Sequence, residues 1–94
     1  MITIDTQNAE AHTHLGLLYL YAKRYSEAIT QLQKASAIDP RSYRAHDYLG
    51  VVWMALKEND KAIQEFNIAI SLDPENRSPD ARQHLHLALT SKRP

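Results

Sequence analysis

The sequence predicts an all-α fold, a solenoid in which antiparallel helix pairs stack on one another. The 94-residue chain has only two glycines and four prolines, the residues that most often break helices. Its apolar residues recur at steps of three and four, which is the helical period. Residues 9–42 align on residues 43–76 without a gap, with ten identities in thirty-four positions. Such self-similarity marks an array of repeats that each pack on their neighbours.

The first unit predicts a helix over residues 9–22 and a second helix that ends before Pro40. Asn8 is the expected N-cap of the first helix, because its side chain can accept a hydrogen bond from a free amide of the first turn. Ser26 is the expected N-cap of the second. Pro40 ends that helix because it lacks an amide proton and disfavours helical geometry in the residue before it.

The second unit repeats the pattern, with helices expected over residues 44–56 and 60–72. Asp60 takes the capping place of Ser26, and Asn59 is expected to adopt the left-handed conformation of the turn. A third helix is expected from Pro79 to about Ser91, capped by Ser78. Its apolar residues are Ala81, Leu85, Leu87, Ala88 and Leu89, and its polar residues Arg82, Gln83, His84 and His86 are expected to be available for solvent.

The two units resemble the tetratricopeptide repeat, whose pattern is W-x2-L-G-x2-Y, then A-x3-F, then P. The matching residues are His12, Leu15, Gly16, Tyr19, Ala28, Leu32 and Pro40, then His46, Leu49, Gly50, Trp53, Ala62, Phe66 and Pro74. Histidine stands in place of tryptophan at His12 and His46, and lysine replaces the usual turn glycine at Lys23 and Lys57. The resemblance implies a right-handed superhelix in which Gly16 and Gly50 permit close helix approach.

The resemblance also divides the chain into one domain with four parts. Residues 1–8 resemble the end of a preceding repeat, because Ile4-Asp5 matches Ile38-Asp39. Residues 9–42 and 43–76 form the two repeats, and residues 77–94 form a capping helix and tail. The chain is therefore expected to be either a slice of a longer array or a short array with a degenerate start.

Members of this family receive a partner's peptide on the concave surface that their first helices line. By that resemblance, the expected groove residues are Glu10, Thr13, His14, Leu17, Tyr21, Arg44, Asp47, Tyr48, Val51 and Met54. Chaperone-binding members use Lys and Asn to hold a peptide carboxylate, but this sequence has Thr13, Leu17 and Tyr48 at the matching places. The groove is thus expected to bind an apolar or amphipathic peptide or helix.

Composition excludes several other function classes. Eleven Lys and Arg balance eleven Asp and Glu, whereas a nucleic-acid or membrane-surface protein would carry an excess of positive charge. With no cysteine the chain has no thiolate metal site and no cysteine nucleophile. No apolar run is long enough to span a membrane, and the first residues lack a signal-peptide pattern, which favours a cytoplasmic location.

No metal, no cofactor and no catalytic site is expected. His12 with His14, and His84 with His86, are two residues apart and point to opposite sides of a helix, so neither pair can hold one ion. His12 and His46 are interpreted as packing residues between neighbouring units. The leading hypothesis is a non-catalytic protein–protein interaction module. The alternatives are a homo-oligomeric scaffold, assembled by end stacking or helix exchange, and a regulatory segment of a larger enzyme.

Overall fold

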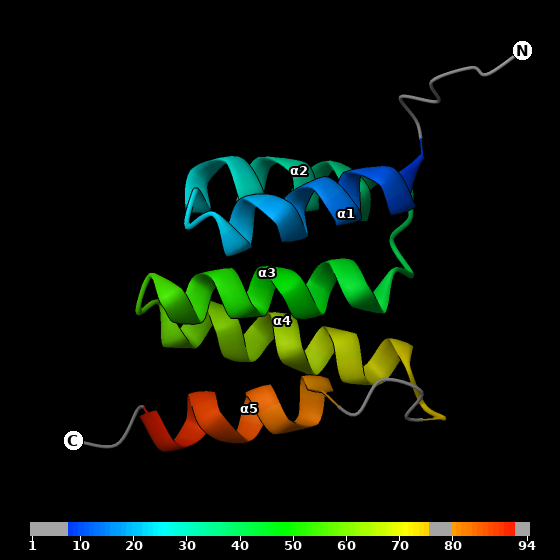
Figure 1. Ribbon diagram of the computed structural model, residues 1–94. Helices are drawn as coiled ribbons and strands as arrows, with labels where there is room; N and C mark the ends of the chain where they lie inside the picture. The colour runs from blue at the N-terminus through cyan, green and yellow to red at the C-terminus, as the bar shows by residue number, and fades with distance from the viewer. Residues whose placement is uncertain (1–7, 76–79, 92–94) are drawn as a thin grey trace, which may run out of the picture.

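The computed structural model describes residues 8–75 and 80–91, and within them the chain forms helices and turns only. The helices are α1 (Ala9–Tyr21), α2 (Tyr25–Ile38), α3 (Tyr43–Ala55), α4 (Asn59–Leu72) and α5 (Asp80–Ser91). Helices α1 and α2 form one antiparallel pair, α3 and α4 form a second, and α5 lies against α4 (Figure 1). The predicted all-α solenoid is confirmed. Residues 1–7, Ser78 and Pro79, with the predictions made for them, lie outside the described residues.

The turn inside each pair is made by a lysine in the left-handed conformation. Lys23 and Lys57 have φ angles of 62° and 63°. In the first turn the amide of Arg24 donates to the carbonyl of Tyr19 at 2.8 Å, and the amide of Lys23 donates to Leu20 at 3.0 Å. This is the Schellman closure, which satisfies carbonyls that the helix end leaves free. The prediction of a left-handed Asn59 was wrong.

Two of the three N-caps predicted within the described residues were also wrong. Asn8 caps α1 as expected, and its side chain accepts from the amides of Glu10 and Ala11 at 2.9 and 3.3 Å. Helices α2 and α4, however, begin at Tyr25 and Asn59, so that Arg24 and Glu58 occupy their N-cap positions. Because the left-handed lysine reverses the chain within one residue, Ser26 and Asp60 already lie in the first helical turn.

Two buried clusters hold the helices together. The first joins α2 to α3 and consists of Ala28, Leu32, Leu49 and Val52. The second joins α4 to α5 through Ala62, Phe66 and Ala88. Leu32 and Phe66 are fully buried, and each lies against the glycine of the first helix in its own pair. A single large side chain thus fills the space within a pair and reaches the next helix along the array.

Replacing Gly50 with alanine is expected to cost up to about 2 kcal/mol of stability. A Cβ atom there would lie 2.6 Å from Cδ1 of Phe66, whose ring is fully buried. Overpacking costs about 1–3 kcal/mol, and the better helix propensity of alanine returns about 1 kcal/mol. Urea unfolding measures the difference, with Gln64→Ala on the exposed side of α4 as a control that changes little. A Gly50→Ala variant that is more stable than the native chain would contradict this packing.

Candidate functional site

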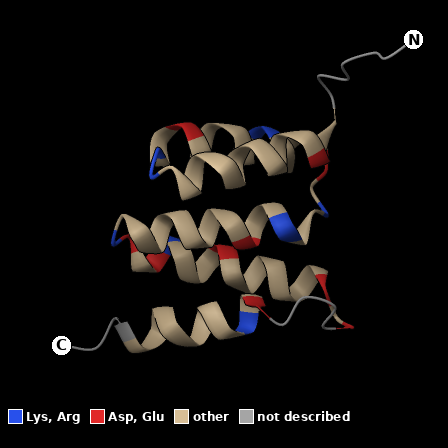
Figure 2. Cartoon of the chain, in the orientation of Figure 1, with Lys and Arg blue, Asp and Glu red and all other residues tan. Residues whose placement is uncertain are grey.

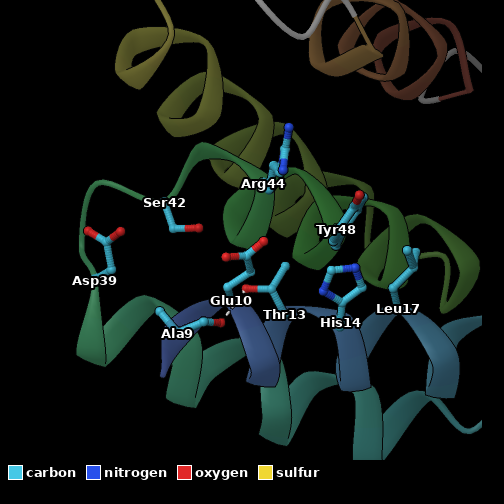
Figure 3. A pocket seen from close by; sticks show the side chains of 9 residues that line it. All are labelled: Ala9, Glu10, Thr13, His14, Leu17, Asp39, Ser42, Arg44 and Tyr48. Carbon is cyan, nitrogen blue, oxygen red and sulfur yellow. Dashed lines mark hydrogen bonds between the residues drawn. The ribbon is translucent and has the colours of Figure 1, made fainter. Parts of the chain in front are cut away.

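An open hollow of about 160 Å³ lies between α1 and α3, toward the N-terminal ends of both helices. Figure 3 shows side chains reaching it from α1, from α3 and from the loop that joins α2 to α3. Six of its nine lining residues are among the predicted groove residues, namely Glu10, Thr13, His14, Leu17, Arg44 and Tyr48. The other three are Ala9, Asp39 and Ser42. Its size suits one or two side chains of a bound chain rather than a whole small molecule.

The hollow has a polar end next to the loop. Asp39 accepts a hydrogen bond from the amide of Arg41 at 3.1 Å, and Ser42 accepts one from the amide of Ala45 at 3.3 Å. The Thr13 hydroxyl donates to the carbonyl of Ala9 at 2.8 Å. These three side chains are held by their own backbone, so their positions are fixed before any ligand arrives.

The other end of the hollow is formed by larger side chains. Leu17 and Tyr48 are half-buried, while His14 is exposed and lies between Thr13 and Leu17 on α1 (Figure 3). Burial raises the pKa of the Tyr48 hydroxyl above its ordinary value of 10.0, so this group stays neutral and can donate a hydrogen bond at neutral pH. The guanidinium of Arg44 lies over the ring of Tyr43. The hollow therefore combines two carboxylates, of Glu10 and Asp39, with an apolar and aromatic wall.

The remaining four predicted groove residues lie outside this hollow. Tyr21 is 74% exposed at the far end of α1. Val51 and Met54 are half-buried and pack against the cluster of α4 and α5. Asp47 is only 3% exposed, which leaves little of its carboxylate for a ligand. That these ten residues bind a partner stays a prediction.

Asp47 instead joins α3 to α5. Nδ1 of His84 lies 3.0 Å from Oδ1 of Asp47, and the His84 ring lies 5.5 Å from that of Phe66. Burial raises the pKa of the Asp47 carboxyl, and the hydrogen bond and charge of His84 act in the opposite direction. The expectation that His84 faces solvent was wrong, because α5 turns this side chain inward onto the second repeat.

Two other histidines link the helices within each pair. Nδ1 of His12 lies 2.7 Å from Oε1 of Gln31, and Nδ1 of His46 lies 2.7 Å from Oε1 of Glu65. Both contacts span nineteen residues and occupy equivalent positions in the two repeats. These bonds tie the two helices of one unit together. Packing of His12 and His46 between units stays a prediction.

The part of the chain that the structure describes has neither a metal-binding cluster nor a membrane-spanning helix. No group of three or more His, Cys, Asp or Glu side chains lies close enough there to hold a metal ion. No described helix is both long and apolar enough to cross a membrane.

The three lining residues that sequence reasoning missed come from the ends of helices. Ala9 opens α1, and Asp39 and Ser42 flank the loop between the repeats. A signal for them existed: Ser42 is the repeat equivalent of Asn8, so it must lie on the same side of the solenoid as Ala9, where the first helix of each repeat begins. The sequence predicts Pro40 only as the end of a helix, which does not indicate that Asp39 lines a hollow.

The helix pairs, the glycine contacts and the 34-residue period together describe a repeat protein. The profile of the Tetratricopeptide repeat family matches residues 13–79. The chain belongs to the tetratricopeptide repeat family. A comparison of this tetratricopeptide repeat chain with curated protein sequences finds no match.

Solved structures of tetratricopeptide repeat proteins share the fold. MamA is 34% identical with a TM-score of 0.86, over 95% of this chain and 51% of MamA. This chain thus spans about half the length of MamA. The TPR2B domain of yeast Sti1, solved in complex with pHsp70, is 22% identical with a TM-score of 0.87, over 92% of this chain and 72% of that one. The second tetratricopeptide repeat domain of human RPAP3, solved with the HSP70 peptide SGPTIEEVD, is 25% identical with a TM-score of 0.81. The match covers 89% of this chain and 68% of that one.

Proposed function

We propose that the chain is a non-catalytic protein–protein interaction module whose concave surface binds an apolar or amphipathic peptide or helix of a partner. The observation that carries this proposal is the hollow between α1 and α3, where fixed polar groups stand beside an apolar and aromatic wall. Binding sites of this kind use apolar surface for affinity and a few placed polar groups for orientation. Support for a binding role of this fold comes from human RPAP3, solved with an HSP70 peptide, and from yeast Sti1, solved in complex with pHsp70.

The charges of the hollow argue against an acidic ligand. Glu10 and Asp39 both line it, and their carboxylates would repel a peptide such as SGPTIEEVD, the HSP70 peptide bound by RPAP3. The guanidinium of Arg44 also lines the hollow, over the Tyr43 ring, so two carboxylates stand against one guanidinium there. We infer that the preferred peptide presents an aromatic or aliphatic side chain toward Leu17 and Tyr48, and a neutral or basic residue toward Glu10.

Selection from a random twelve-residue peptide library tests the ligand class. The selected peptides are expected to share two apolar anchors spaced three or four residues apart, as on one face of a helix. Binding of a synthetic selected peptide is measured by isothermal titration calorimetry, with SGPTIEEVD as the comparison peptide. An SGPTIEEVD peptide that binds more tightly than the selected one would contradict the proposed ligand class.

Tyr48→Ala is expected to weaken binding of the selected peptide by about ten- to thirty-fold, because truncated aromatic anchors cost about 1–2 kcal/mol or more. Since Tyr48 also packs against the first core cluster, circular dichroism must show that the variant is folded. His14→Ala, at an exposed position beside it, provides a second test that does not disturb the core. His86→Ala is the matched control, an exposed histidine on α5 that should leave affinity unchanged. Equal effects of His14→Ala and His86→Ala would remove His14 from the site.

A further inference from the structure

The surface that holds the hollow continues from α3 onto α5. Helix α3 packs on α2 and also contacts α1, and in the same way helix α5 packs on α4 and also contacts α3. Helix α5 thus occupies the place of the first helix of a third unit (Figure 1). Ala81 and Ala88 support this register, because they are buried like their repeat equivalents Ala45 and Val52. Helices α1, α3 and α5 therefore present repeat-equivalent residues on one surface.

An apolar row crosses this surface. Leu17 of α1, Val51 of α3 and Leu87 of α5 are repeat equivalents in this register. Leu17 is half-buried and lines the hollow, Val51 is half-buried, and Leu87 is 51% exposed. The exposed Leu89 differs, because its repeat equivalent Trp53 packs against both buried clusters. Leu87 therefore belongs to the surface of the hollow, whereas Leu89 lies on the side where units stack.

The next unit has a hydrogen bond at the place that corresponds to the hollow. Thr13 and Tyr48 line the hollow from α1 and from α3. Their repeat equivalents are Asp47 and His84, which are hydrogen-bonded to each other at 3.0 Å. A ligand side chain cannot pass between these two residues, so it instead meets Leu87, which lies one turn after His84 on α5.

Charged residues mark one edge of the same surface. Glu10, Arg44 and Asp80 are repeat equivalents in the first turns of α1, α3 and α5, and all three are exposed. Besides burial, the charges of Arg44 and Asp80 act on the pKa of Tyr48, so this edge adjoins the wall of the hollow. The charge alternates from negative to positive to negative along the edge. The edge therefore complements a segment that has a basic residue near each end and none in its middle.

The apolar row favours a helix over an extended chain as the ligand. Leu17, Val51 and Leu87 offer no side-chain hydrogen bond, so an extended backbone laid on them would lose water without gaining partners. A helix satisfies its own backbone groups and presents a continuous apolar side. Neighbouring helices lie about 8–10 Å apart, so the row spans about 16–20 Å. A helix of twelve residues is about 18 Å long and matches that span.

We infer that the partner segment is an amphipathic helix that lies across α1, α3 and α5. Its apolar side rests on Leu17, Val51 and Leu87. A basic residue near each of its ends faces Glu10 or Asp80. This inference rests on the proposed function and extends it, because it makes α5 a third part of the binding surface. Leu87 and Asp80 are then contact residues that do not line the hollow itself.

Isothermal titration calorimetry of the whole chain with the synthetic library-selected peptide tests the contact with α5. Leu87→Asn is expected to weaken binding by about three- to ten-fold, because it removes apolar surface from the contact. Leu89→Asn is the matched control, since Leu89 is 49% exposed on the same helix, and it should leave affinity unchanged. Equal effects of the two substitutions would overturn the contact with α5 and leave the hollow as the binding site. A selected peptide that fails to bind the native chain would overturn the proposed function as well.

The charged edge is tested by the same titration. Asp80→Asn is expected to weaken binding by about two- to five-fold at low salt, because an exposed ion pair contributes modestly and is screened by ions. Asp60→Asn is the matched control, because Asp60 is likewise an exposed acidic residue in the first turn of its helix, α4. An equal effect of Asp60→Asn, or an effect of Asp80→Asn that high salt does not reduce, would overturn the basic ends of the ligand.

The helical form of the ligand is tested on the peptide itself. Replacing its central residue with proline is expected to weaken binding by at least about ten-fold, because proline breaks the interior of a helix. Circular dichroism of the mixture should show more helix than the sum of the separate components. A proline-containing peptide that binds as tightly as the original one would overturn a helical ligand.

Discussion

Replacing Phe66 with alanine is expected to remove a large part of the stability of the fold. Phe66 is the largest fully buried side chain among the described residues, and it contacts both Gly50 of its own repeat and the cluster that holds α5. Truncating such a residue costs about 3–5 kcal/mol, through lost burial and the cavity that remains. That loss is a large part of the about 5–15 kcal/mol that stabilises an ordinary domain.

Urea unfolding followed by circular dichroism measures this loss. Ile68→Ala is the matched control, because Ile68 lies on the same helix but is 41% exposed, and the substitution is expected to cost less than about 1 kcal/mol. If Phe66→Ala cost no more than Ile68→Ala, the ring could not be the common core of α3, α4 and α5.

Replacing His84 with alanine is expected to cost about 2–3 kcal/mol, and more at neutral pH than in acid. Asp47 is 3% exposed and would lose the hydrogen bond that His84 makes to it at 3.0 Å. Leaving a buried charged group without its partner costs about that much. The variant would also lose the contact between the His84 ring and Phe66.

The pH dependence follows from the pKa of Asp47. In the native fold, burial raises this pKa above its ordinary value of 3.8, while His84 lowers it. Without His84 the effect of burial is unopposed, and the folded pKa rises further. A group with a raised folded pKa binds its proton more tightly in the fold, so its contribution to stability is full below the unfolded pKa and is lost as pH rises through the folded pKa. The His84→Ala variant should therefore lose more stability than the native chain between about pH 4 and about pH 7.

Urea unfolding of the native chain and of the His84→Ala variant, at about pH 4 and at about pH 7, checks this result. Asp47→Asn removes the titrating group and keeps an acceptor for His84. The added pH dependence should therefore be absent when Asp47→Asn is combined with His84→Ala. An equal loss of stability at both pH values in the single His84→Ala variant would show that Asp47 does not titrate in this window.

Much of the fold could be predicted because the same packing residues occur in both repeats. The glycines and alanines recur at the same places in both units, and that recurrence identifies the close contacts within each pair. The turns were predicted less well, because that prediction rested on the N-cap preferences of Ser26 and Asp60 alone. The observed turns depend instead on a backbone closure at Lys23 and Lys57, which no capping preference reveals.

The candidate site could be predicted only where the period applies. Thr13, Leu17 and Tyr48 were placed on the concave side by repeat position, and all three line the hollow. Asp47 was placed there by the same rule, yet α5 covers it. Helix α5 does not follow the 34-residue spacing, because two extra residues precede it and its sequence differs from those of α1 and α3. Its position over Asp47 therefore depends on tertiary packing, which the repeat spacing does not predict.

The proposed binding surface is tested most directly by a nuclear magnetic resonance titration of the whole chain with the library-selected peptide. Amide resonances of residues 9–17 at the start of α1 and of 39–48, from the loop into α3, are expected to shift most. Those on the outer sides of α2 and α4 should change little. The largest shifts on the outer sides of α2 or α4 would contradict a binding site between α1 and α3.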